Sequence, residues 1–205
     1  MKRGLFFILL GLFICLSLDA KAASFNIGAQ IPQATDVNVT ITKYDSKGTE
    51  IPTDDTAVGT VSSMDFGKLE YKTITRSDGK KYSMFLTNYY FGVDVGVNGA
   101  APWTIYHYVD GNDFKTTGDG GLGDNIIVTF IKQTSDTQGT KLAAYTIADS
   151  YGKYFSSTTL SGGWLRIYYG IATGASGEPT GAKTIGLTEN AKTYSGTIVI
   201  TLTPR

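Results

Sequence analysis

Few side chains in this sequence could carry chemistry. It contains one histidine, His107, and one cysteine, Cys15. A serine–histidine–aspartate triad needs a base that titrates near neutrality, and only His107 could supply it. The segment 103–109 around it is rich in strand-forming residues, and no Gly-x-Ser-x-Gly turn is present to hold a nucleophile. We interpret His107 as a strand side chain and predict that the protein is not an enzyme.

A stretch rich in glycine and aspartate, 110–124, is the candidate for a metal site. Oxygen ligands gathered in a flexible loop suit Ca²⁺. However, Lys115 stands where an EF-hand loop has glycine, and Asp, Asn and Gly are also the usual residues of turns. Both interpretations stay open; the turn cluster is favoured, so we assign no metal ligand and no cofactor. The oxygen-bearing side chains are Asp110, Asn112, Asp113, Asp119 and Asp124.

Aromatic residues are the strongest remaining sign of a ligand. Their rings could form a platform on which sugars stack, although aromatic residues also favour strands and fill sandwich cores. We favour the core interpretation and keep a secreted carbohydrate-binding module or adhesin as the alternative function. A β-sandwich hydrolase ranks third, because no motif links the four glutamates to an aspartate. The aromatic candidates are Tyr89, Tyr90, Phe91, Trp103, Tyr106, Tyr108, Trp164, Tyr168 and Tyr169.

Residues 1–22 have the three-part pattern of a secretory signal peptide. Lys2 and Arg3 are followed by the apolar run 4–18, and small residues precede a cleavage site after Ala22. The apolar run is shorter than the roughly 20 residues that span a bilayer as a helix. We therefore predict cleavage and export, to the periplasm, the cell surface or the medium.

Cleavage after Ala22 would change both the charge and the cysteine content. It removes three of the 18 basic and one of the 18 acidic side chains, which leaves a net charge of −2. This balance gives no sign of nucleic-acid binding. It also removes the only cysteine, so no disulfide could form and the core alone must stabilise the exported chain.

Apolar and polar residues alternate with a period of two, as in half-buried strands. The pattern begins at 23–31, stops at Pro32 and resumes at 37–42. In the last such segment, 194–203, the alternation places Ile198, Ile200 and Leu202 on one face. With Tyr194 we assign them to the core. Further strands are expected at 64–74, 82–86, 91–97, 103–109, 125–132, 163–171 and 194–203, with a hairpin turn at 77–79 and loops at 46–60, 110–124 and 172–181.

Roughly ten short strands and no convincing helical period predict an all-β fold. The segment 134–160 has no clear pattern, and 142–145 could be a helical turn or part of a strand. Turns at irregular spacing favour an immunoglobulin-like antiparallel β-sandwich. We expect 23–205 to form a single domain.

Three segments resemble strands of known secreted bacterial proteins. They are VSSMDFGKL at 61–69, WLRIYYG at 164–170 and KTYSGTIVITL at 192–202. Similar motifs occur in a pilin-like group that includes spore coat protein U-like domains and chaperone–usher fimbrial subunits. The resemblance implies immunoglobulin-like sandwiches that assemble into surface fibres. Members often carry a disulfide near the N-terminal strand, and this chain departs from them there.

We therefore expect an exported, non-enzymatic structural subunit of a surface fibre or coat that assembles by strand pairing. The partners implied are other subunits and a periplasmic chaperone, with a glycan only under the alternative. Residues 23–31 have two possible roles. They are either the first strand of their own sandwich, the favoured role, or a donor strand that enters a neighbouring subunit. The side chains that would enter successive pockets are Phe25, Ile27, Ala29 and Ile31.

Overall fold

The computed structural model describes residues 24–30, 37–45, 57–76, 78–118, 120–136, 138–187 and 193–204. They form thirteen strands and almost no helix, which confirms the all-β prediction. No helix in these ranges is long and apolar enough to cross a membrane. The expected signal segment 1–22 and Ile31 lie outside the described residues.

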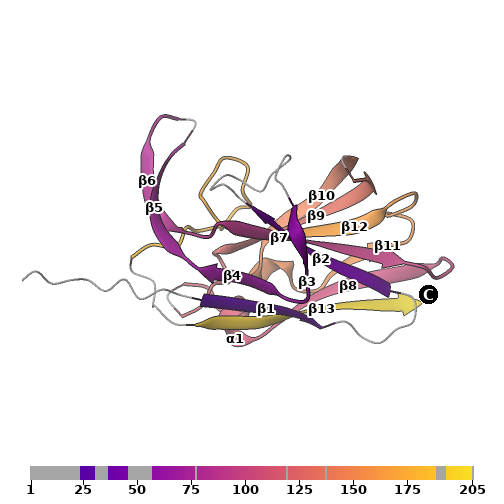
Figure 1. Ribbon diagram of the computed structural model, residues 1–205. Helices are drawn as coiled ribbons and strands as arrows, with labels where there is room; N and C mark the ends of the chain where they lie inside the picture. Colours follow the sequence, from indigo (N-terminus) through magenta and orange to yellow (C-terminus); the bar gives the residue numbers. More distant parts are fainter. Residues whose placement is uncertain are drawn as a thin grey trace, which may run out of the picture.

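Two sheets face each other across the core, as Figure 1 shows. All pairs in them are antiparallel except β1 with β13, which is parallel. The five-stranded sheet has the order β11 (Lys153–Ser156), β8 (Trp103–Asp110), β13 (Tyr194–Pro204), β1 (Ser24–Gln30) and β4 (Met64–Lys68). The six-stranded sheet has the order β10 (Gln138–Thr146), β9 (Ile126–Ser135), β12 (Trp164–Ile171), β7 (Tyr89–Val97), β2 (Val37–Asp45) and β3 (Ala57–Val61).

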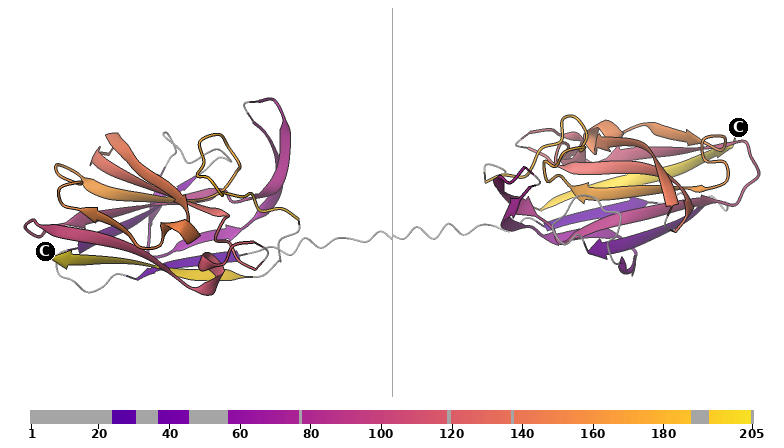
Figure 2. Two further views of the ribbon diagram at one scale, coloured as in Figure 1. Left: turned by 180° about the vertical axis from the view of Figure 1, so that it is seen from behind. Right: turned by 90° about the horizontal axis from the view of Figure 1, so that it is seen from above.

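A hairpin of β5 (Glu70–Thr75) and β6 (Lys81–Leu86) projects from the sandwich (Figure 1, Figure 2). Its turn contains Gly79 at φ +75°, a backbone conformation that glycine adopts without steric cost. This agrees with the expected hairpin turn at 77–79 for Asp78 and Gly79, whereas Ser77 is outside the described residues. The hairpin is a two-stranded sheet, so it depends on contacts at its base for stability.

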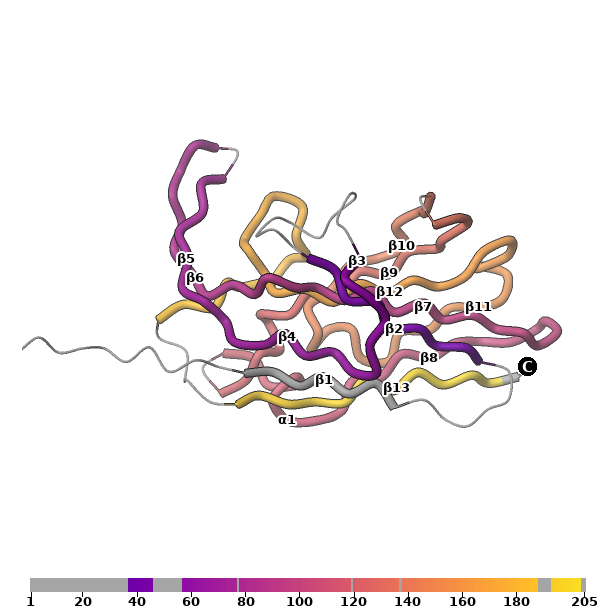
Figure 3. The backbone as a smooth tube through the Cα atoms, in the orientation of Figure 1, coloured from indigo at the N-terminus to yellow at the C-terminus, as the bar shows by residue number. Residues whose placement is uncertain are grey.

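The loop after β12, residues 172–187, contacts the hairpin near its base and, through Arg76, at its turn (Figure 3). The Phe85 amide donates a hydrogen bond to the Ile185 carbonyl at 2.8 Å, and Arg76 donates to the Thr173 carbonyl. Glu178 accepts from the Thr173 amide at 2.7 Å and from the Gly174 amide at 2.8 Å. These bonds and the isolated antiparallel bridge between Phe85 and Ile185 give the loop a defined course and tie it to the hairpin.

The core lies between the two sheets and is contributed by alternate residues of their strands. On β13, Tyr194, Ile198 and Ile200 are buried, and Leu202 packs against the core while half-buried. Phe114, from the short helix α1 (Asn112–Lys115), packs directly on Gly196 of β13. A Cβ at Gly196 would collide with that ring, so glycine lets the helix close this part of the core.

The structure corrects several expected boundaries. The expected strand 64–74 divides at the buried residue Leu69, because β4 belongs to a main sheet and β5 to the projecting hairpin. Strand β3 lies at the end of the expected loop 46–60, and its exposed residues give it little hydrophobic pattern. The segment 134–160 contains β10 and β11, so 142–145 is strand. A bulge between Lys141 and Ala143 disrupts the alternation in β10.

Burial of Ile200 predicts that Ile200→Asp is strongly destabilising. The side chain is 1% exposed, so the variant would place an unpaired carboxylate in the core, at a cost above about 3 kcal/mol. Chemical denaturation followed by circular dichroism measures this cost. The matched control is Thr203→Asp, an exposed position on the same strand, where we expect little change. Wild-type stability in Ile200→Asp would contradict the assigned packing.

Candidate functional site

The first described strand, β1, occupies an interior position in the five-stranded sheet. It pairs in parallel with β13 and antiparallel with β4. In the β13 register, Phe25, Ile27 and Ala29 are the Cα partners of Tyr194, Gly196 and Ile198. The structure thus places three of the four assembly candidates beside the terminal strand of their own chain. The fourth, Ile31, is outside the described residues.

The position of β1 makes the sheet dependent on it. No pairing joins β4 directly to β13, so β1 alone connects β4 to the rest of its sheet. Without β1, both neighbours would present unpaired amide and carbonyl groups, the template that another strand can fill. The pairing with β4 is interrupted by a register shift between Phe25 and Asn26. Backbone pairing on both sides therefore holds β1 in the sheet.

His107 lies in the core, 0% exposed, on the inner face of β8. Its Nδ1 is 3.0 Å from the Ser150 carbonyl oxygen and its Nε2 is 2.9 Å from the Tyr169 hydroxyl. A carbonyl can only accept, so Nδ1 carries the proton in the neutral ring and Nε2 accepts from the tyrosine. His107 thereby joins β8 to β12, two strands of opposite sheets.

The surroundings of His107 keep it neutral. Burial lowers the pKa of His107 from 6.5 to about 4, and burial also raises the pKa of Tyr169 well above its usual value. The rings of Phe130 and Tyr169 pack beside the imidazole, with centroid distances of 5.1 and 6.1 Å. The group has partners for both nitrogens and no exposed surface, as the interpretation of His107 as a strand side chain requires.

The aspartates of the segment 110–124 have separate partners. Asp110 pairs with Lys115 at 3.0 Å, and this hydrogen bond lowers the pKa of the Asp110 carboxyl. Asp113 accepts from the Ser195 amide at 3.0 Å, and Asp124 pairs with Lys183 at 2.8 Å. Within the described residues, no group of three or more potential ligands could hold a metal ion. Asp119 is outside them.

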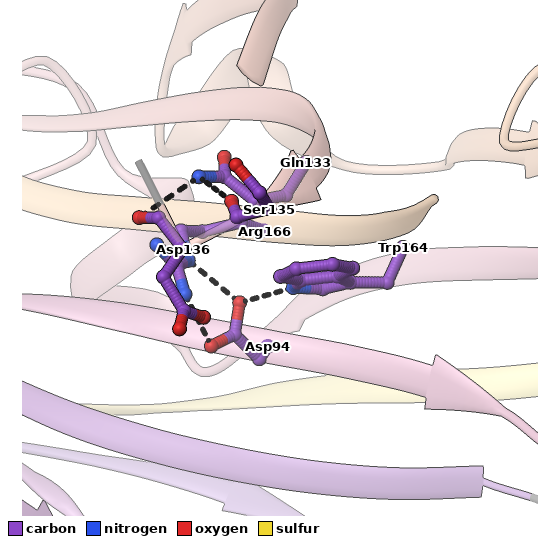
Figure 4. A network of polar contacts seen from close by, with 6 residues as sticks. All are labelled: Asp94, Gln133, Ser135, Asp136, Trp164 and Arg166. Atoms are coloured by element: carbon purple, nitrogen blue, oxygen red, sulfur yellow. Dashed lines mark hydrogen bonds and ion pairs between the residues drawn. The ribbon is translucent and has the colours of Figure 1, made fainter. Parts of the chain in front are cut away.

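A polar network joins Asp94, Trp164 and Arg166 (Figure 4). It lies on the outer face of the six-stranded sheet, because the residues that alternate with them on β7 and β12 belong to the core. Asp94 of β7 accepts from Trp164 Nε1 at 2.8 Å, from Arg166 Nε at 2.6 Å and from Arg166 Nη2 at 2.8 Å. The hydrogen bond to Asp94 raises the pKa of Arg166 further. Because both carboxylate oxygens are engaged, this bidentate pair ties β7 to β12 and leaves little capacity for a ligand.

Tyrosines fill the same face beside that network. Tyr44 and Tyr90 stack at 4.8 Å, and Tyr168 packs against both at 6.1 and 5.9 Å. Tyr90 is only 4% exposed, so this group is packed rather than open. The nine aromatic candidates therefore form no single platform. Phe91 and Tyr169 are core residues, and Tyr90, Trp164 and Tyr168 belong to this outer face.

A second tyrosine group lies on the outer face of the five-stranded sheet. Tyr106 and Tyr108 project there from β8, opposite to His107, as the alternation predicts. Tyr154 of β11 and Tyr151 of the preceding turn extend the group, and both are exposed, at 68% and 55%. Sequence reasoning missed these two, because no strand pattern was recognisable in 134–160. The alternation of Tyr154 with the buried Phe155 is the signal that was available.

Comparisons with known proteins leave the function to be argued from this geometry. A scan against family models found no match to the chain, and searches of curated proteins and of solved structures found none either. The resemblance to pilin-like proteins therefore stays an expectation from three short motifs.

The buried neutral imidazole predicts a pH dependence of stability. Below pH 6.5 the unfolded chain binds a proton at His107, whereas the folded chain does not until about pH 4. The free energy of unfolding therefore falls as the pH drops through this window, by about 3 kcal/mol from this group, and the contribution is complete above pH 6.5. Denaturation midpoints from pH 7 to pH 4 measure the fall.

His107→Gln separates this effect from the titration of carboxylates. The variant is less stable at pH 7, because it weakens the bonds to Ser150 and Tyr169. The difference in the free energy of unfolding between the wild type and this variant should shrink as the pH falls to 4. A stability difference that stays constant across this range would show that His107 does not titrate as its burial implies.

Proposed function

We propose that the protein is an exported, non-enzymatic structural subunit of a surface fibre or coat, and that subunits assemble by exchanging β1. The observation that supports this proposal is the interior position of β1 between β13 and β4. The expected signal peptide and the three motif segments supply the context. In the single chain, β1 completes its own sheet, and in the fibre it would complete the sheet of a neighbour.

Most of the interactions that strand exchange breaks in one subunit form again in the next subunit. When β1 leaves its sheet, it gives up its backbone pairing with β13 and β4, and it forms the same pairs in the next subunit. The free-energy difference per subunit between the single chain and the strand-exchanged polymer is therefore small. The barrier to removing β1 from its own sheet is large. Each subunit donates at one place and accepts at another, so the contact is head-to-tail and yields an open polymer when the rotation does not close.

The sequence offers a background for a disulfide test of this exchange. Cys15 is the only cysteine, so Cys15→Ser gives a cysteine-free chain. Gln30 and Val199 are Cα partners across β1 and β13. In the double variant Gln30→Cys and Val199→Cys, exchange would link successive chains and give a ladder on a non-reducing gel. We expect the ladder to lengthen with protein concentration and incubation time.

Mixing the two single-cysteine variants sharpens the test, because a Gln30–Val199 link between different chains requires exchange. The control pair is Thr73→Cys with Ser83→Cys, Cα partners within the β5–β6 hairpin, which should close only inside one chain. If the Gln30–Val199 pair also closes only inside one chain at every concentration, and the mixed single variants form no mixed dimer, then β1 does not exchange and the proposed assembly is wrong.

A further inference from the structure

We propose that the tyrosine row on the outer face of the five-stranded sheet binds an extended, uncharged polysaccharide chain. The tyrosine row comprises Tyr151, Tyr108, Tyr106 and Tyr154. This site would add a ligand to the proposed structural role, and it does not depend on strand exchange. It rests on the geometry of the four rings, on their exposure and on the chemistry of the residues beside them.

The four rings form one contiguous group across β8 and the neighbouring β11 side of the sheet. Tyr151 contacts Tyr108 at a centroid distance of 5.6 Å, Tyr108 contacts Tyr106 at 6.1 Å, and Tyr106 contacts Tyr154 at 6.3 Å. The order follows from the fold. Tyr106 and Tyr108 are two residues apart on β8, and Tyr154 is the Cα partner of Tyr106 on β11. Ring faces grouped side by side on a sheet can stack on successive rings of a sugar chain.

Exposure distinguishes this row from the other aromatic groups of the protein. Tyr154 and Tyr151 are among the few large hydrophobic residues that the described chain leaves exposed. Tyr106 and Tyr108 are half-buried, which holds their rings in place between the exposed ends of the row. Large apolar rings grouped on a surface are uncommon without a binding role. Tyrosine is also well suited to one, because it offers an apolar face and a polar tip.

The residues beside the row favour a sugar over other ligands. Val199 and Thr201 of β13 are the Cα partners of Tyr108 and Tyr106, and Thr203 lies further along the same strand. The hydroxyl groups of Thr201 and Thr203 can donate and accept hydrogen bonds, as those of a sugar do. The C–H faces of pyranose rings can pack on the tyrosine rings through weak contacts that add along a chain.

Charge argues against an ionic ligand. Within the described residues, the one cation that lies over a ring of the row is Lys115, 5.5 Å from the Tyr151 ring centroid, and it is paired with Asp110 at 3.0 Å. A nucleic acid or an acidic polysaccharide would need unpaired cations along its length. The row offers stacking without that charge, which leaves a neutral glycan as the matching class.

The test is titration of the full exported chain with uncharged hexasaccharides. The probes are cellohexaose, chitohexaose, xylohexaose and mannohexaose, followed by calorimetry, with pull-down on insoluble cellulose and chitin. We expect at least one probe to bind. In the double variant Tyr151→Ala and Tyr154→Ala, the affinity for that probe should fall at least tenfold. Tyr154→Phe should retain most of the affinity, because it keeps the ring.

The matched control is Tyr71→Ala, which removes a tyrosine 45% exposed on the β5–β6 hairpin and should bind as the wild type does. Melting curves establish that each variant folds. The proposal is overturned if no probe binds at millimolar concentration, or if the double variant binds unchanged. It is also overturned if the wild type self-associates and the double variant is monomeric, since the row would then be an interface between copies.

Discussion

The hydrogen bond between His107 and Tyr169 spans the core and joins the two sheets. It requires a neutral imidazole whose other nitrogen is satisfied by the Ser150 carbonyl, and the structure supplies that partner. It also determines what the rest of β8 can do. Because the side chains of a strand alternate, an inward His107 obliges Tyr106 and Tyr108 to face outward. A polar link in the core and a tyrosine row on the surface are thus two consequences of one strand register.

The same core explains how a chain whose one cysteine lies in the expected signal segment can fold without a disulfide. Buried apolar side chains from both sheets form one contiguous cluster, and Phe114 closes it against Gly196. The buried imidazole of His107 has a partner for each ring nitrogen. On the outer face of the six-stranded sheet, Asp94 pairs with Arg166 and Trp164. Low pH destabilises this arrangement, because a protonated His107 imidazole would be buried without a compensating charge nearby.

Alternation in the sequence predicted strands that bury one face and expose the other. It failed for strands without that regular pattern. The alternation in the last strand anticipated the inward positions of Ile198 and Ile200, because one face of that strand meets the core. It missed β3, an edge strand with mostly exposed residues, and β10, where a bulge breaks the period. It also missed the parallel pairing of β1 with β13, since pairing partners distant in sequence leave no local pattern. The tyrosine row combines β8 with β11 and the turn before it, so only the fold could assemble it.

The sheet order separates the two proposed activities. The order β11, β8, β13, β1 and β4 places the tyrosine row on β8 and β11 and the exchanging strand on the far side of β13. Replacement of β1 by the same strand of a neighbour would restore the pairing of β13 and leave β8 and β11 as they are. Each subunit of the proposed fibre would then present one intact tyrosine row. Weak stacking on a single row would become strong binding along the fibre, because every further contact with the same polysaccharide forms at high effective concentration.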